Sequence, residues 1–280
     1  MKLSVITDEI SQDFEHALDV MQEYRVPGAE LRCLWDVNIA DMDEDGIARA
    51  KKLVADRGVE VSCIASPFFK CELFGEGGEK GMTHGAHDRG LDEQMELLER
   101  CIRLCDEFGT RFIRVFAFWK RGELTDDIES RIVEAFIEPA ERARRAGVVL
   151  GLENEHACYL GTGVETARVI EAVGSPGLMG VWDPGNAFCA GETPYPVGYE
   201  AMKHHLVHVH VKDAVRGDDG KVSFVRIGDG EIDYRGQFAA LRADGYSGFI
   251  SLETHFKPGG SSEEGSRLCL AALNEMIGDG

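Results

Sequence analysis

Eight short apolar runs alternate with longer amphipathic segments along this chain of 280 residues, and this alternation narrowly limits its fold. Segments between the runs carry apolar residues at helical spacing, and several end in glycine, which is typical of a helix C-terminus. Strands that alternate with helices predict a parallel sheet, and eight such units in this length predict an α/β protein with a (β/α)8 TIM barrel fold. The predicted strands are 2–7, 28–32, 59–66, 111–118, 147–153, 178–183, 206–212 and 248–254.

We expect a single domain over residues 1–280, because no linker, low-complexity tract or close repeat interrupts the pattern. A doubly wound sheet is the alternative, but no GxGxxG sequence follows the first predicted strand. Two long loops, 67–90 and 213–233, follow the third and seventh strands. They lie at the strand ends where barrels build their sites.

The charge and the apolar runs exclude two classes of partner. A net charge of −20 argues against a nucleic-acid partner and against an anionic membrane surface. The N-terminus lacks the apolar core of a signal peptide, and no apolar run approaches the roughly 18 residues of a membrane span. Eight cysteines are scattered without a CxxC pair, so we expect reduced thiols and a cytoplasmic location.

Polar residues collect at the ends of the last four strands. Read with a period of two, each strand has an aliphatic face and a second face that points into the barrel. Three carboxylates and an imidazole that converge there repel one another unless a cation lies among them. We therefore predict one divalent metal, with Mn²⁺ as first choice and Mg²⁺, Co²⁺ or Zn²⁺ also compatible. The last inward residues, and so the predicted ligands, are Glu153, Asp183, His210 and Glu253.

The segments LENEH, VWDPGNA, HVHVKDAVR, GDGEIDY and SLETH resemble the sugar phosphate isomerase/epimerase family, the xylose isomerase-like TIM barrels. That family includes ketose 3-epimerases, inosose dehydratases and isomerases, and hydroxypyruvate isomerases. The resemblance covers the whole barrel, is most specific from Glu153 onward, and implies one divalent metal bound by the same four residues. It also implies a substrate-binding arginine, because His210, Asp213 and Arg216 keep the spacing of the epimerase His-x-x-Glu motif and its arginine.

The sequence departs from the ketose 3-epimerases at two places. Asp183 is followed by Asn186 where those enzymes have a histidine, and Tyr159 stands where they have a second glutamate. His156 instead follows Glu153 by three positions, as in other members of the family. An inositol-pathway enzyme or an enzyme of oxidised sugars therefore fits at least as well as a free-ketose 3-epimerase.

These residues predict a metal-dependent sugar or sugar phosphate isomerase or epimerase that works through an enediolate. Glu153 and Glu253 are the predicted acid and base. A dehydratase or lyase acting on an inosose or keto-sugar is the alternative, because loss of a β-hydroxyl after proton removal uses the same groups. An abasic-site endonuclease, which needs three zinc ions and further histidines, and a non-catalytic barrel are weaker alternatives. The expected partner is a small carbohydrate, and a homo-oligomer is compatible with the resemblance.

Substrate contacts are predicted at the lip of the barrel. For two of them an internal ion pair is the alternative, between Lys212 and Asp213 and between Glu30 and Arg32. The predicted substrate-binding residues are His156, Asn186, Lys212, Asp213, Arg216, Glu30 and His255.

Three further histidines are expected to have no role in catalysis. His208 lies one layer deeper than His210, so we expect a buried, hydrogen-bonded structural residue. His84 and His87 belong to the first long loop, where a solvent-facing, glycine-rich lid is expected.

Overall fold

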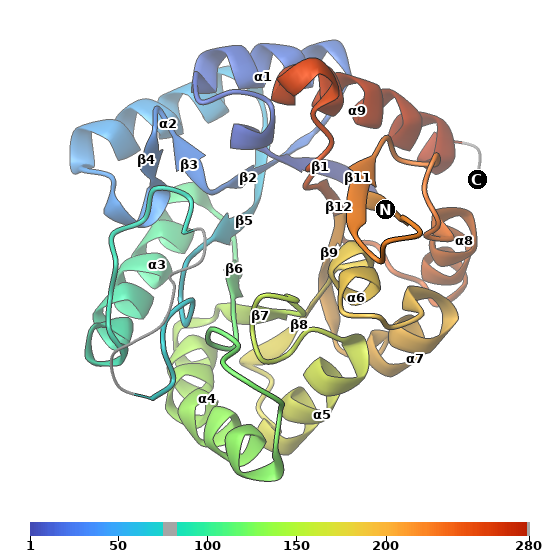
Figure 1. The fold of residues 1–280 in the computed structure, drawn as a ribbon. Coiled ribbons are helices and arrows are strands. Elements are labelled where there is room, and N and C mark those ends of the chain that lie inside the picture. Colours follow the sequence, from blue (N-terminus) through green and yellow to red (C-terminus); the bar gives the residue numbers. More distant parts are fainter. Residues whose placement is uncertain (75–82, 279–280) are drawn as a thin grey trace.

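Eight parallel strands close into a barrel, and the helices surround it (Figure 1). A computed structural model describes residues 1–74 and 83–278. Each strand pairs in parallel with its neighbours, and the last strand returns to the first, where Ser4 faces Ser251. The single predicted (β/α)8 barrel is therefore confirmed. The strands in their order around the barrel are β1 (Lys2–Ile6), β12 (Phe249–Leu252), β9 (Leu206–Val211), β8 (Leu178–Trp182), β7 (Val149–Glu153), β6 (Phe112–Val115), β5 (Glu60–Ala65) and β2 (Gly28–Leu31).

The outer helices begin and end where the sequence indicates. Asp43 and Thr125 accept hydrogen bonds from backbone N–H groups at the starts of α2 and α4, which otherwise lack partners. Gly58, Gly109 and Gly147 follow α2, α3 and α4 with φ of 63°, 68° and 73°, a left-handed conformation that favours glycine. The helices are α1 (Phe14–Glu23), α2 (Glu44–Arg57), α3 (Gln94–Phe108), α4 (Asp126–Ala146), α5 (Gly163–Val173), α6 (Pro184–Cys189), α7 (Tyr199–Met202), α8 (Tyr234–Ala243) and α9 (Ser262–Gly278).

The hydrophobic core fills the space between the barrel and the helices. Leu150 and Leu152 of β7 and Val209 of β9 are fully buried there. The opposite face of the same strands points into the barrel and carries the polar residues. This division into an aliphatic outer face and a polar inner face agrees with the period-two interpretation.

The strict alternation predicted for 206–212 is wrong at its start. The register between β8 and β9 shifts there, because Gly180 pairs with Leu206 and Val181 with His208, which leaves Val207 without a partner. A β-bulge of this kind re-aims the side chains that follow it. The alternation therefore holds only from His208 onward.

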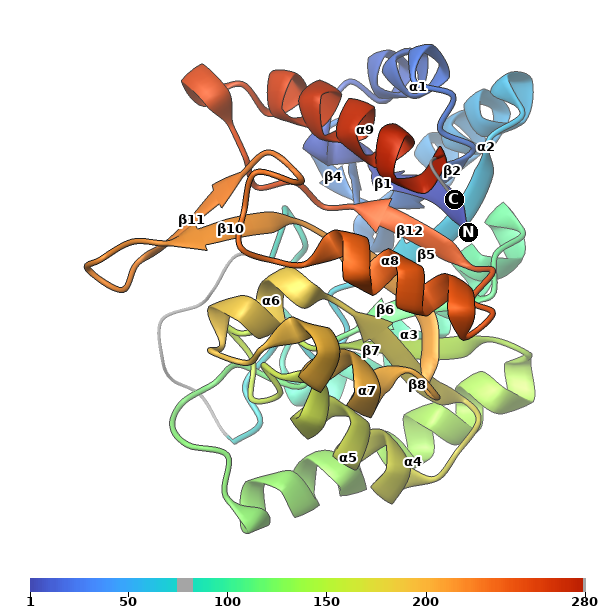
Figure 2. The same ribbon diagram turned by 90° about the vertical axis from the view of Figure 1, so that its right-hand side faces the viewer.

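The second long loop is in part a hairpin. The strands β10 (Asp213–Arg216) and β11 (Val222–Val225) pair antiparallel and project from one end of the barrel (Figure 2). A second small pair, β3 (Cys33–Leu34) and β4 (Val37–Asn38), follows β2. Part of the first long loop, residues 75–82, lies outside the described residues.

Two observations bear on the cysteines and on membranes. All eight cysteines are free, and seven of them are buried. None of the helices in residues 1–74 and 83–278 has both the length and the apolar character needed to span a bilayer.

Candidate active site

The structure brings together the four side chains predicted as metal ligands. One donor atom from each of these residues lies within 4.8 Å of the donors of the other three. They come from β7, β8, β9 and β12, four strands that are neighbours in the barrel. No side chain of the four is more than 6% exposed, so they form a buried cluster at the carboxyl ends of the strands.

Each glutamate of this cluster is held by an arginine from another strand. Arg114 Nη1 donates to Glu153 Oε2 at 3.0 Å, and Arg32 Nη1 donates to Glu253 Oε1 at 2.9 Å. The second oxygen of each carboxylate faces His210 Nδ1, at 3.1 Å for Glu153 and 3.7 Å for Glu253. Although burial opposes ionisation, attraction by His210 lowers the pKa of Glu153. The pKa of Glu253 is likewise held well below its usual range, by Lys212 and His210 against its burial.

Lys212 links the other two carboxylates. Its Nζ lies 2.7 Å from Asp183 Oδ2 and 2.7 Å from Glu253 Oε2. Burial raises the pKa of Asp183 to about 6, and the charge of Lys212 opposes that shift. The pKa of Lys212 itself rises well above its usual range, because the attraction of Asp183 and Glu253 outweighs its burial. The predicted alternative, an ion pair between Lys212 and Asp213, is wrong.

Asp183 has a free acceptor. Its Oδ1 accepts from the backbone N–H of Asn186 at the start of α6. Its Oδ2 is buried and accepts no hydrogen bond in the described structure, although Lys212 Nζ is close to it. A buried carboxylate oxygen without a hydrogen bond is rare and needs an explanation. Together with two glutamates and one imidazole nitrogen it suits a divalent cation bound mainly by oxygen.

Two of the predicted substrate residues lie against the ligands. Asn186 Nδ2 donates to Glu153 Oε1 at 3.2 Å, and Asn186 Oδ1 lies 3.0 Å from His156 Nδ1. His156 also lies 3.1 Å from Glu155 Oε1, and this hydrogen bond raises the pKa of His156. About two fifths of the His156 side chain is exposed, so it lies at the open edge of the cluster.

The other predicted substrate residues have different surroundings. His255 lies at the mouth of the barrel near Glu253, where burial lowers its pKa to about 4. Asp213 turns away from the cluster and accepts from the backbone N–H groups of Gly228 and Gly230. Arg216 donates to backbone carbonyls in the exposed hairpin region.

Glu30 lies below the ligands and is fully buried, with both oxygens near His208 and His210. The alternative, an ion pair of Glu30 with Arg32, is wrong because Arg32 pairs with Asp8, Glu9 and Glu253. The expectation that His208 is buried and hydrogen-bonded is confirmed.

The two histidines of the first long loop differ from each other. His87 is exposed, as expected, and lies 3.2 Å from Asp41. His84 is half-buried over a small cavity that Arg32 and Arg114 also line, so the solvent-facing position predicted for it is wrong. Burial, with repulsion by Arg32, lowers the pKa of His84 to about 2.

Sequence reasoning missed two residues that shape the cluster. Arg114 lies in the middle of an apolar strand, with its charge directed inward to Glu153. A single charged residue within an otherwise apolar strand was the available signal. Glu9 follows β1, pairs with Arg32, and has its pKa raised to about 7 by burial. No periodic pattern marks Glu9, because it lies in a short 3-10 helix (Thr7–Glu9).

Comparison with known proteins places this arrangement among related barrels. The sequence profile of the xylose isomerase-like TIM barrel family matches residues 18–273. The chain is 25% identical over 171 residues to the L-ribulose-5-phosphate 3-epimerase UlaE of Salmonella paratyphi C, which spans 60% of this chain and 59% of that protein. It is 29% identical over 159 residues to an inosose dehydratase of Bacillus licheniformis, over 50% of this chain and 51% of that protein.

A solved structure confirms the fold over the full length. The IOLI protein, crystallised with a bound zinc atom, superposes with a TM-score of 0.79 at 15% identity. The match covers 100% of this chain and 99% of that chain. The similarity therefore extends from β1 to α9, and the four-residue cluster lies inside the matched region.

Proposed function

The chain belongs to the xylose isomerase-like TIM barrel family, and from this premise we propose a metal-dependent sugar or sugar phosphate isomerase or epimerase. One observation carries the proposal, the convergence of Glu153, Asp183, His210 and Glu253 at the strand ends around an acceptor that has no hydrogen bond. The similarity to sugar epimerases and to an inosose dehydratase supports an enzyme of carbohydrate metabolism.

The same four residues are the proposed ligands of one divalent cation. Mn²⁺ is our first choice because three of the four ligands are carboxylates, and the bound zinc of the IOLI protein makes Zn²⁺ the second. When bound, such an ion supplies Lewis-acid polarisation of a substrate carbonyl.

Glu153 and Glu253 are the proposed acid and base. They follow strands that β8 and β9 separate, so they approach a substrate from different sides of the barrel lumen. One carboxylate takes the proton from the carbon next to the carbonyl, and the C–H electron pair moves into the enediolate. The other glutamate, in its acid form, returns a proton to carbon. Return to the opposite face gives an epimer, and return to the neighbouring carbon gives an isomer.

Three neighbouring side chains would orient the reacting groups. Asn186 holds Glu153 through its amide and holds His156 through its carbonyl oxygen. Lys212 presents the only ammonium group within hydrogen-bond distance of Asp183 and Glu253 in the described part of the chain. We propose that His156 and Lys212 contact substrate oxygens, because they border the cluster.

A dehydratase or lyase is the second candidate. The similarity to inosose dehydratase favours it, as do Asn186 and Tyr159 at the positions where ketose 3-epimerases have histidine and glutamate. Proton removal by one glutamate is the same step, and a β-hydroxyl then leaves as water with the proton of the other. An abasic-site nuclease is disfavoured, because Ser66 and Phe116 follow β5 and β6 where additional histidine ligands would be needed.

The decisive experiment combines metal analysis with solvent exchange. We expect about one divalent metal per untagged chain, and loss of that metal in a Glu153→Gln/Glu253→Gln variant. Metal-loaded protein is then incubated in D₂O with ketoses, their phosphates and inososes, and deuterium in the recovered sugar is measured by mass spectrometry. Exchange with an epimeric or isomeric product supports the first candidate, and an unsaturated product supports the second. Absence of metal after supply of Mn²⁺ and Zn²⁺ would refute both.

A further inference from the structure

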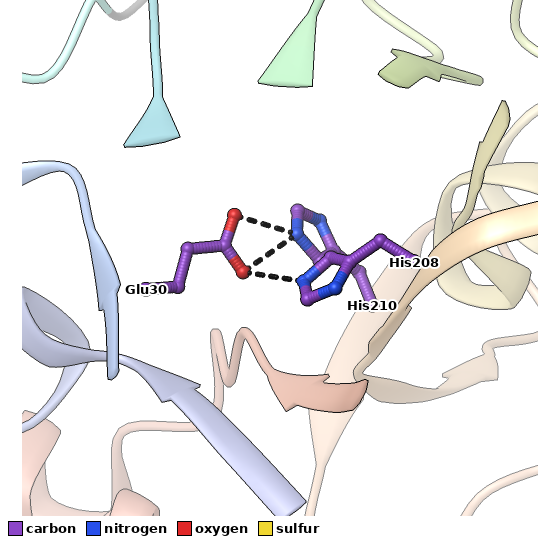
Figure 3. Close-up of side chains that lie close together, drawn as sticks. All are labelled: Glu30, His208 and His210. Atoms are coloured by element: carbon purple, nitrogen blue, oxygen red, sulfur yellow. Dashed lines mark hydrogen bonds and ion pairs between the residues drawn. The ribbon is translucent and has the colours of Figure 1, made fainter. Parts of the chain in front are cut away.

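A buried triad lies beneath the proposed metal ligands, formed by Glu30, His208 and His210 (Figure 3). His210 Nε2 lies 3.0 and 3.1 Å from the two oxygens of Glu30, and His208 Nε2 lies 2.8 Å from Glu30 Oε2. Glu30 comes from β2 and both histidines from β9, which are not neighbours in the barrel. The triad therefore crosses the lumen, and all three side chains are fully buried.

The two ring nitrogens of His210 face different groups. Nδ1 faces the proposed ligands, 3.1 Å from Glu153 Oε1, whereas Nε2 faces Glu30. An ionised carboxylate only accepts hydrogen bonds, so Nε2 must carry the proton that it donates to Glu30. In the neutral ring the lone pair is then on Nδ1, directed at the ligand cluster.

We infer that Glu30 is a positioning residue that fixes the tautomer and the ring orientation of His210, so that Nδ1 is presented to the metal. This inference rests on the proposed function, because that function requires the metal. A carboxylate that accepts from the second nitrogen of a ligating histidine is a recurrent arrangement, and it increases the basicity of the ligand.

His208 holds Glu30 in turn. Its Nε2 donates to Glu30 Oε2, and its Nδ1 is buried without a hydrogen-bond partner among the described residues. Glu30 is therefore the one hydrogen-bond partner of the His208 ring in residues 1–74 and 83–278. With both oxygens engaged and no exposed surface, Glu30 is better placed to orient His210 than to contact substrate.

A second metal within the triad is the competing interpretation. One donor atom of each of its three residues lies within 4.8 Å of the others, and two imidazoles with a carboxylate also suit zinc. The observed separations of 2.8–3.1 Å between nitrogen and oxygen match direct hydrogen bonds. The triad is also closed to solvent, whereas the four-ligand cluster has His156 at an open edge.

The first test needs no variant. We would load ¹⁵N-histidine-labelled protein with Zn²⁺ and assign the tautomer of His210 from its ¹⁵N–¹H couplings. We expect Nε2 to carry the proton and Nδ1 to be the nitrogen that binds zinc. Zinc on Nε2, or a proton on Nδ1, overturns the inference.

The second test measures zinc affinity by competition with a chelator. We expect Glu30→Gln to weaken zinc binding by about 10–100-fold, with a smaller loss for His208→Gln. The control is Ser62→Ala, which removes a buried hydrogen bond to Ser4 in the same lumen without touching a ligand; we expect its affinity to stay within about twofold. An unchanged affinity in folded Glu30→Gln overturns the inference, as does a second zinc that is lost in His208→Gln.

These readouts require no turnover, so they separate the two proposals. Protein that binds one zinc through Nδ1 of His210 but exchanges no deuterium supports the role of Glu30 and refutes the proposed reaction. Exchange that persists with unchanged zinc affinity in Glu30→Gln supports the reaction and refutes the positioning role.

Discussion

The two halves of the barrel divide the work at the site. The strands β7, β8, β9 and β12 supply every proposed ligand, and these strands are consecutive in the barrel. The strands β2 and β6 supply no ligand, but Arg114 and Glu30 on those strands, and Arg32 just after β2, each contact one of the ligands. One half therefore offers the groups that bind and react, and the other half fixes their charge and orientation.

The largest expected effect is in the ligand half. Replacement of Glu153 or Glu253 by glutamine removes a proton-transfer group, so we expect kcat to fall by about 10²–10⁴-fold. Deuterium uptake from solvent by the substrate measures the loss. The control is Glu134→Gln, which changes an exposed glutamate of α4 by the same atoms. Full activity in either ligand variant would remove the distinction between the halves.

The supporting half is tested by a buried and an exposed arginine. Arg114 is 3% exposed and pairs with Glu153, so Arg114→Met leaves a buried carboxylate without its partner. We expect the free energy of unfolding of chelated protein to fall by about 3–5 kcal/mol. Arg168 pairs with Glu129 at the surface, and Arg168→Met should lower it by under about 1 kcal/mol. Urea unfolding measures both, and equal losses would contradict the role assigned to Arg114.

The loop after β5 is tested by pH. The pKa of His84 is about 2 in the folded protein and lies near 6.5 when the chain is unfolded. Only the unfolded chain takes up this proton below pH 6.5, so the free energy of unfolding falls as the pH is lowered. We expect a loss of about 1 kcal/mol between pH 6.5 and 5.5 that is absent in His84→Gln. His87→Gln, at an exposed site of the same loop, should keep the wild-type dependence.

The smallest effects compare serines inside the barrel. Ser62 Oγ shares a hydrogen bond of 2.7 Å with Ser4, whereas Ser251 Oγ on β12 is buried without a partner in the described structure. We expect Ser62→Ala to lower the free energy of unfolding by about 1 kcal/mol and Ser251→Ala to change it by under about 0.5 kcal/mol. Thermal unfolding measures the difference, and a larger loss for Ser251→Ala would reveal a partner that bonds it in solution.

Local patterns were sufficient for the strands and for the ligand cluster. The inward phase of four consecutive strands selected Glu153, Asp183, His210 and Glu253, because side-chain direction in a strand follows from position alone. The phase argument failed at Val207, where a bulge breaks the register and leaves no mark in the composition.

The partners of the ligands could not be predicted in the same way. His208 and Glu30 are 178 positions apart, and Arg32 and Glu253 are 221 positions apart. Such contacts depend on how the barrel closes and on which side chains reach across its lumen. Lys212 illustrates the point, because sequence proximity suggested Asp213, whereas closure places Asp183 and Glu253 around its ammonium.

The closure of β12 onto β1 has a consequence for the order of synthesis. A ribosome makes the chain from its N-terminus, and Glu253 follows the last strand of the barrel. A nascent chain that has released residues 1–240 carries Glu153, Asp183 and His210 but lacks the fourth ligand. Full metal affinity therefore arises only in the finished barrel, so incomplete chains do not compete with it for the ion.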